Sequence, residues 1–150
     1  MRFKYQWSDE YSRACVKITA NPALKAAILK VTTEIEQGGS LLVMDRATSR
    51  QYKLGYREIM TIEAGDYQSR VTTIDGRIYD VNGRLKSFEN LAAVGLQRIS
   101  RTTILNLRLI SSFGTEKYAR LVVETCTGQQ LLVSRHYAQQ IREALVCTKD

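Results

Sequence analysis

Histidine and proline each occur only once in this 150-residue chain. With His136 alone, the chain has no histidine pair for a metal site and no H-E-x-x-H motif. A G-x-S-x-G elbow, a P-loop and a G-x-G-x-x-G loop are also missing. The aspartates at positions 66, 75 and 80 are expected at turns, where they bond to the backbone. We therefore expect a protein that is not an enzyme and needs no cofactor and no metal.

Cysteine is also scarce, with Cys15, Cys126 and Cys147 far apart in the chain and no C-x-x-C pair. An odd, scattered set predicts neither a disulfide framework nor a metal knuckle, and it fits reduced thiols in a cytosol. No apolar run approaches the ~18 residues needed to cross a bilayer. The opening MRFKYQWSDEYSR lacks the apolar segment of a secretory signal. The sequence thus predicts a soluble cytoplasmic protein.

Acidic residues are outnumbered. The 22 basic and 15 acidic side chains give a net charge of +7 and an isoelectric point near 9.5. The segment from Gly95 to Arg142 contains seven of the basic residues and two of the acidic ones. A basic excess of this kind favours a polyanionic partner, either a nucleic acid or an anionic membrane surface.

The first 40 residues predict a small βα extension. Residues 2–7 and 14–20 resemble short strands. A helix should follow, because Asn21 suits the N-cap, Pro22 suits the first helical position, and glycines come after the end. Its apolar residues recur at helical spacing and are expected to pack in the core; they are Leu24, Ile28, Val31 and Ile35.

From residue 41 to residue 150 the pattern is mainly β with short helices. Strands are expected at 41–45, 51–55, 59–64 and 103–107, and hairpins at 70–81 and 117–134. Asp75-Gly76 predicts a type I′ turn in the first hairpin, and the second should turn near Thr127-Gly128. A short helix is expected at 87–94 with Ser87 as its cap. The closing helix, 134–146, carries an apolar stripe; it consists of Tyr137, Ile141 and Leu145.

Four stretches in this order resemble the LytTR DNA-binding domain of bacterial transcription regulators. They are REIMTIEAGDY (57–67), TIDGRIYDVNGRLKSFEN (73–90), QRISRTTILNL (97–107) and LLVSRHYAQQIREAL (131–145). The third stretch departs from the family pattern, with Ser100 where many members have histidine, Thr102 where they have serine and Leu105 where they have valine. The chain is similar to standalone LytTR regulators, which lack a receiver domain and carry a short N-terminal βα extension.

The resemblance implies loops that enter successive major grooves of DNA, and three segments fit that role. The first follows the strand that contains Glu63 and consists of Tyr67, Gln68, Ser69 and Arg70. The second consists of Arg98, Ser100, Arg101 and Thr102, and the third of Arg135 and His136. Arg101 suits a base reader because a guanidinium can bond guanine O6 and N7 together. The hydroxyls of Ser100 and Thr102 suit phosphate or base contacts. Asn106 is expected to tie the second segment to the strand that follows.

The leading interpretation is a sequence-specific regulator that binds double-stranded promoter DNA. A homodimer is compatible with paired binding sites, although no heptad or interface pattern establishes one. A nonspecific DNA or RNA binder is a rival of the same chemistry. From a different class, the chain could be an interaction module, controlled through residues 1–40 by a small membrane protein. That partner is implied by the resemblance alone.

Overall fold

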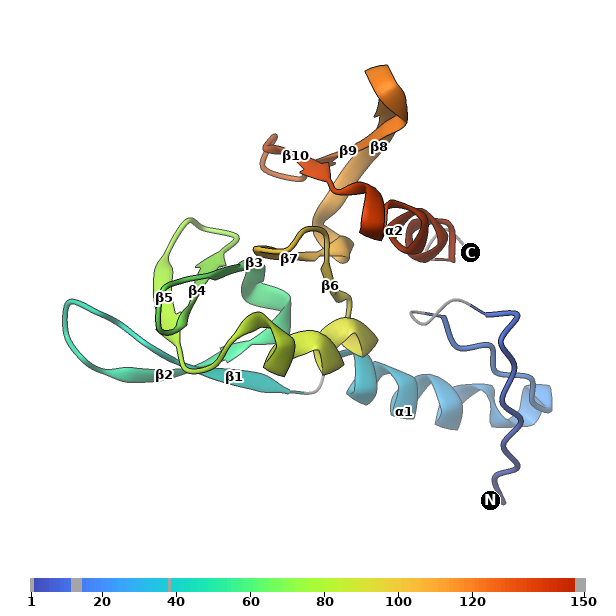
Figure 1. Cartoon of the computed structure of the whole chain (residues 1–150). Helices are drawn as coiled ribbons and strands as arrows, with labels where there is room; N and C mark the ends of the chain where they lie inside the picture. The colour runs from blue at the N-terminus through green and yellow to red at the C-terminus, as the bar shows by residue number, and fades with distance from the viewer. Residues whose placement is uncertain (1, 12–14, 38, 148–150) are drawn as a thin grey trace.

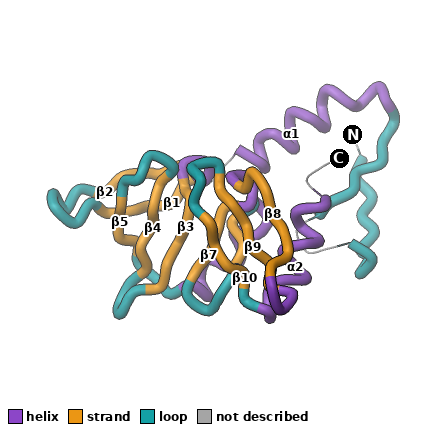
Figure 2. The backbone as a smooth tube through the Cα atoms, turned by 90° about the horizontal axis from the view of Figure 1, so that it is seen from above, coloured by secondary structure: helices purple, strands orange, loops and turns teal. Residues whose placement is uncertain are grey.

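A computed structural model describes residues 2–11, 15–37 and 39–147, without the side chains of residues 33–37 and 147 (Figure 1). Two antiparallel sheets form the body. In the larger sheet the strand order is β2-β1-β5-β4-β3-β7-β6, and in the smaller one it is β10-β9-β8. Viewed from above, the smaller sheet continues beside β7, and helix α2 lies next to it (Figure 2). The expected mainly β fold with short helices is confirmed.

The strands are short and close to their expected positions. They are β1 (Ser40–Met44), β2 (Gln51–Gly55), β3 (Ile59–Ala64), β4 (Ser69–Thr73), β5 (Ile78–Val81), β6 (Leu96–Arg98), β7 (Thr103–Asn106), β8 (Ile110–Glu116), β9 (Arg120–Thr125) and β10 (Gln130–Val133). The α-helices are α1 (Lys25–Gln37) and α2 (Arg135–Cys147). Five 3₁₀ helices complete the described elements: η1 (Pro22–Leu24), η2 (Tyr56–Glu58), η3 (Leu85–Val94), η4 (Leu107–Leu109) and η5 (Lys117–Ala119).

The first core lies on one face of the larger sheet. Tyr79, Val71, Ile62 and Ile104 stand opposite one another across β5, β4, β3 and β7. Since side chains alternate between the two faces of a strand, residues in register across the sheet share a face. All four are buried, and η3 covers them with Leu85, Phe88 and Leu91.

The second core uses the opposite face of β7. Leu105, the neighbour of Ile104, is fully buried against β9 and α2. From α2 it meets a cluster containing Ile141 and Leu145, with Tyr137 packed at its margin. The expected apolar stripe of the last helix is therefore confirmed. Strand β7 contributes to both cores, so the segment just before it is anchored from both sides of the sheet.

The two hairpins lie at the predicted positions, but the type I′ turn predicted for the first hairpin is wrong. A type I′ turn needs a positive φ at both central residues. In the first hairpin Gly76 has φ 83°, whereas Asp75 is not among the residues with positive φ. Gly76 N–H donates to Thr73 O at 3.1 Å, and Thr73 N–H donates to Arg77 O at 2.9 Å. This is the three-residue loop in which a left-handed glycine follows a turn. Gly128, with φ 84°, repeats it in the second hairpin.

The helix expected at 87–94 begins earlier and is a 3₁₀ helix. η3 starts at Leu85, and its N-cap is Arg84. Ser87 is inside the helix, where its hydroxyl donates to the carbonyl of Arg84 at 2.7 Å. The helix ends at Gly95, whose φ of 95° suits a residue without a side chain. Ser87 is therefore not the cap.

The N-terminal region agrees with the sequence in part. Asn21 caps the helix, its side-chain oxygen accepting from Ala23 N–H at 2.9 Å, and Pro22 occupies the first turn. However, residues 2–7 and 15–20 form no strand. The stripe of α1 is not in the core: Leu24 and Val31 are exposed and Ile28 is half-buried, while the side chain of Ile35 lies outside the description.

Their exposure has a structural reason. Helix α1 meets the body of the protein at η3, and both views show it projecting to one side of the sheets (Figures 1 and 2). In the described part of the chain, no helix is long and apolar enough to cross a membrane.

Candidate nucleic-acid interface

Main-chain hydrogen bonds bring the three predicted segments together. We name them the first loop (residues 65–68, with Arg70 just beyond it), the central loop (99–102) and the third segment (134–136). Ala64 N–H, at the end of β3, donates to Thr102 O of the central loop at 2.8 Å. Ser134 N–H, before α2, donates to Ile99 O at 2.9 Å. The central loop is therefore tied directly to both of its neighbours.

The central loop is a short turn between β6 and β7. Ile99 N–H donates to Thr103 O at 3.0 Å, and Ile99 is buried in the second core. The hydroxyl of Ser100 accepts from Thr102 N–H at 3.2 Å. Ser100 is half-buried, whereas Arg101 and Thr102 are exposed. The apolar residue thus anchors the turn, and the serine helps to shape it. Arg101 and Thr102 are presented at its tip.

Arg98 stabilises the central loop by bonding to main-chain carbonyls of that loop. Its Nε donates to Ser100 O at 3.1 Å, and its Nη2 donates to Arg101 O at 2.7 Å. Its Nη1 forms an ion pair with Glu89 of η3 at 2.9 Å. Only 23% of the Arg98 side chain is exposed. This placement differs from the expected DNA contact: the guanidinium is directed at the protein's own carbonyls.

Asn106, the last residue of β7, is structural as expected, but its side-chain bonds lead to η2, β3 and η4 and not to the central loop. It is 1% exposed. Its Nδ2 donates to Ile59 O at 2.9 Å, and its Oδ1 accepts from Arg108 N–H at 3.2 Å. The side chain therefore joins the end of β7 to the beginning of β3, two strands that flank the candidate interface.

The residues predicted for the first loop differ in how far they are exposed. Tyr67 is 97% exposed, Gln68 is half-buried and Arg70 is exposed. Ser69, in contrast, is 1% exposed and donates from its hydroxyl to Gly83 O at 2.7 Å. A buried and bonded hydroxyl cannot touch a duplex on the surface. The placement of Ser69 therefore disagrees with the predicted contact.

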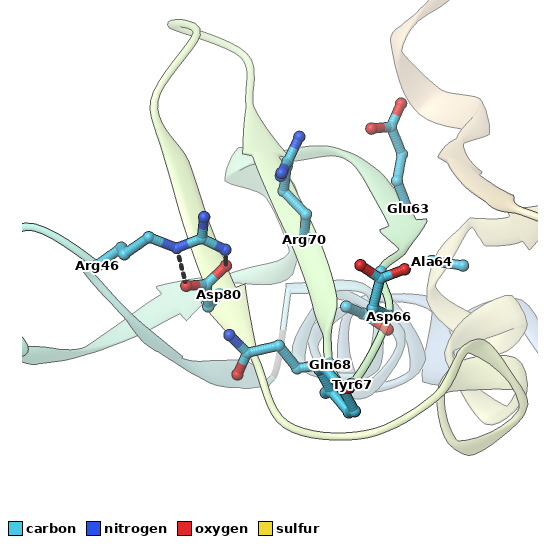
Figure 3. A pocket seen from close by; sticks show the side chains of 10 residues that line it. Arg46, Glu63, Ala64, Asp66, Tyr67, Gln68, Arg70 and Asp80 are labelled. Carbon is cyan, nitrogen blue, oxygen red and sulfur yellow. Dashed lines mark hydrogen bonds and ion pairs between the residues drawn. The ribbon is translucent and has the colours of Figure 1, made fainter.

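A pocket of about 330 Å³ adjoins the first loop (Figure 3). Charged side chains from three strands and two loops line it: Arg46, Glu63, Asp66, Arg70 and Asp80. Arg70 stands directly opposite Glu63 on one side and Asp80 on the other. Because opposed residues of antiparallel strands have Cβ atoms about 4.5–5.5 Å apart, the carboxylate of Glu63 lowers the positive potential around Arg70.

Asp80 was expected in a turn but is a buried residue of β5, 5% exposed. Arg46 holds it in a bidentate pair, with Nε and Nη2 donating at 2.9 and 3.0 Å (Figure 3). The hydrogen bond to Asp80 and its negative charge raise the pKa of Arg46 above its usual value. Sequence reasoning missed this pair because its two residues are 34 positions apart.

The third segment begins α2. Arg135 and His136 are both exposed in its first turn. The His136 ring lies edge-on to Tyr137, with 4.8 Å between the ring centroids. The free N–H groups at a helix N-terminus attract phosphate. The interface as a whole therefore exposes one arginine from each segment, namely Arg70, Arg101 and Arg135. In the described part of the chain, no acidic, histidine or cysteine side chains form a group suited to a metal.

Comparisons with known proteins agree with this architecture. Residues 49–146 match the family model described as the LytTr DNA-binding domain. Among solved structures, the chain is similar to the LytTr DNA-binding domain of a response regulator from Bacillus cereus. The TM-score is 0.62 and the identity 22%, and the match covers 72% of this chain and 98% of that one. At this identity the likeness shows the fold. No curated protein sequence matches the chain.

Proposed function

Since the chain belongs to the LytTR family of DNA-binding domains, we propose that it is a bacterial transcriptional regulator that binds promoter DNA sequence-specifically. The observation that carries the proposal is the joining of the three segments by main-chain hydrogen bonds at Thr102 and Ile99. Such bonds fix the spacing of the segments before DNA arrives. A preorganised surface loses less conformational entropy on binding than three independent loops would.

In this proposal the central loop enters a major groove and reads bases. Arg101 is exposed at its tip and has the planar fork that bonds guanine O6 and N7, a contact worth about 1–3 kcal/mol of discrimination. Thr102 beside it donates to a phosphate or a base edge. Ser100 supports the loop through its bond to Thr102 N–H, and its hydroxyl also shares a hydrogen bond with the Thr102 hydroxyl at 3.3 Å.

The flanking segments hold the protein on the duplex. Arg135 and His136 contact phosphate together with the N-terminal amides of α2. On the other side, Gln68 and Arg70 reach the next major groove. Arg70 stands opposite Glu63, whose carboxylate weakens the attraction of Arg70 to phosphate and favours a directed hydrogen bond to a base over a purely electrostatic contact.

The test is fluorescence anisotropy of the full chain on its own upstream promoter DNA and on scrambled DNA, over a salt series. We expect tighter binding to the promoter and a log–log salt slope of several units, about 0.9 per phosphate neutralised. The Arg135→Ala variant should lower that slope by about 0.9. Arg57→Ala is the matched control, because Arg57 is also exposed but lies in η2, at the beginning of β3, whereas the first loop follows the opposite end of that strand.

Equal, weak binding to both DNAs would contradict the proposal. The family match would then describe a shared fold, and the interaction module controlled by a small membrane protein would become the better account.

A further inference from the structure

The β8–β9 hairpin ends in an exposed turn that none of the three segments of the candidate interface includes. We call this turn the hairpin tip; it consists of Lys117, Tyr118 and Ala119, the residues of η5. Tyr118 is 82% exposed, and Lys117 is exposed as well. The tip lies between the stretches 97–107 and 131–145 that carry the family resemblance, so the resemblance assigns it no role.

The backbone of the tip is unusual for the residues that it contains. Tyr118 has φ 65° and ψ 29°, and Ala119 has φ 57°. This left-handed conformation is rare for residues other than glycine and is an outlier for a bulky side chain. The β4–β5 and β9–β10 hairpins place a glycine in it, Gly76 and Gly128. Residues held in such a conformation cluster at active sites and ligand clamps, so the tyrosine points to a role in binding.

The strand register places the tip beside the third segment. Val133, the last residue of β10, is opposite Leu121 of β9. Glu116, the last residue of β8, is opposite Arg120. The end of β10, which leads into the third segment, and the tip are therefore at the same end of the smaller sheet. Since neighbouring strands lie about 4.8 Å apart and β9 separates β10 from β8, the tip is roughly 10 Å from the beginning of α2.

The tip also lies on the same side of the molecule as the rest of the candidate interface. Seen from above, the β3–β4 loop, the loop before β7, the start of α2 and the tip follow one edge (Figure 2). In Figure 1 the hairpin, drawn in orange, projects beyond the end of β10. Arg142 of α2 holds the hairpin in this place, because its Nη2 donates to Thr115 Oγ1 at 3.2 Å. The helix that begins with Arg135 thus positions the hairpin as well.

This end of the hairpin is basic. Lys117, Arg120 and Arg142 contribute three positive charges, and Glu116 contributes one negative charge. The carboxylate of Glu116 offsets the charge of Arg120, which stands opposite it. Among the residues that the structure describes, none forms an ion pair with Lys117. Its exposed ammonium group is therefore available to an anion.

We propose that the hairpin tip is a fourth DNA contact, which binds the sugar–phosphate backbone beyond the third segment; this inference rests on the proposed function. Lys117 pairs with a phosphate. The Tyr118 hydroxyl donates a hydrogen bond to a phosphate oxygen, and its ring packs against the neighbouring sugar. Contacts of this kind fix the position of a protein on the duplex but carry no sequence information. The tip therefore lengthens the bound site without changing which bases are read.

Fluorescence anisotropy on promoter DNA over a salt series tests the charge. Lys117→Ala should lower the log–log slope by about 0.9, the value for one phosphate. The ratio between Kd on promoter DNA and Kd on scrambled DNA should stay at the wild-type value, because a backbone contact does not read bases. Arg57→Ala is again the matched control, since Arg57 is an exposed cation at the beginning of β3, and it should keep the wild-type slope.

Tyr118→Gly separates binding from folding. Glycine adopts the left-handed conformation at no steric cost, so the thermal unfolding midpoint should stay the same or rise. Kd on promoter DNA should nevertheless rise about twofold to tenfold, the effect of losing one hydrogen bond. Gln129→Gly is the control, because Gln129 lies in the β9–β10 turn at the opposite end of the same sheet; its Kd should equal that of wild type.

Hydroxyl-radical footprinting locates the contact on the duplex. The wild-type protein should protect a group of sugars at one end of the bound site. Lys117→Ala and Tyr118→Gly should leave that group open to cleavage while the rest of the footprint remains. A footprint that weakens evenly over its whole length would instead assign the two residues a general effect on binding and contradict a local contact.

Two results would overturn the inference, and they differ in what they say of the proposed function. If the wild type prefers promoter DNA but both tip variants keep its slope, Kd and footprint, the tip is no DNA contact and the proposed function stands. If the wild type binds promoter and scrambled DNA equally weakly, the proposed function fails and this inference fails with it.

Discussion

Replacing Arg98 by alanine should weaken DNA binding without removing a contact to DNA. The substitution deletes the bonds from Arg98 to Ser100 O and Arg101 O and the ion pair with Glu89. A hydrogen bond from a charged donor contributes about 1.5–3 kcal/mol when buried. Because the Arg98 side chain is partly exposed and Glu89 is half exposed, we discount these values and expect about 1–2 kcal/mol in total. If the native loop is needed for binding, Kd rises about tenfold.

The salt dependence of binding distinguishes an Arg98 that stabilises the central loop from an Arg98 that contacts DNA. Loss of a phosphate contact lowers the log–log slope by about 0.9. Arg98→Ala should therefore raise Kd on promoter DNA while leaving the slope within error of wild type, whereas Arg135→Ala should reduce the slope. Arg98→Lys keeps the charge but loses the planar fork, and we expect it to behave like Arg98→Ala.

A slope reduced by about one unit in Arg98→Ala and restored in Arg98→Lys would refute this reasoning. That pattern would show that the charge of Arg98, and not its bonds to the loop, is what DNA binding requires.

Three further substitutions probe the fold of the larger sheet. Asn106→Ala should lower the free energy of unfolding by about 1–3 kcal/mol in urea titrations, since the buried carbonyl of Ile59 loses the donor that Asn106 supplies; an unchanged midpoint would contradict the structural role of Asn106. Ser69→Ala should cost about 1 kcal/mol and leave Kd for promoter DNA unchanged, and a weaker Kd at equal folding would show that the serine takes part in binding. Asp75→Asn tests the pH dependence of stability. Hydrogen bonds from Thr73 and then Arg77 lower the pKa of Asp75, so this carboxyl stabilises the fold above its unfolded pKa of about 3.9, and the contribution disappears as pH falls through the lower folded value. Thermal unfolding followed from pH 6 to pH 2 should show a smaller acid loss in the variant, and identical profiles would contradict the sign.

Local patterns in the sequence predicted much of the fold. Alternation and turn residues placed both hairpins, and helical spacing identified the buried face of α2. Alternation also indicates where the Ser69 side chain points. Ser69 is two residues before Val71, a core residue of the same strand, so both side chains lie on the same face and the Ser69 hydroxyl faces inward. An Asp-Gly pair, in contrast, suits two kinds of hairpin loop, and only the backbone angles decide between them.

The hydrogen bonds that hold the interface segments together could not be predicted in this way. An arginine that bonds DNA and an arginine that bonds its own backbone use the same planar fork, and the sequence does not show where the carbonyls of Ser100 and Arg101 point. Similarly, the bonds at Thr102 and Ile99 join residues that are far apart in the chain. The stripe of α1 was wrongly predicted to pack in the core, because helical spacing identifies an apolar face but does not show what covers it.

The central claim is that this surface reads base sequence, and Arg101 tests it most directly. The measurement is the Kd of wild type and of Arg101→Ala on promoter DNA, on scrambled DNA, and on a series of promoters with single base-pair changes. We predict that wild type loses about 1–3 kcal/mol when one particular G·C pair is changed, and that Arg101→Ala no longer distinguishes that change. Equal weakening of Arg101→Ala on promoter and scrambled DNA, with every base-pair preference retained, would contradict the account.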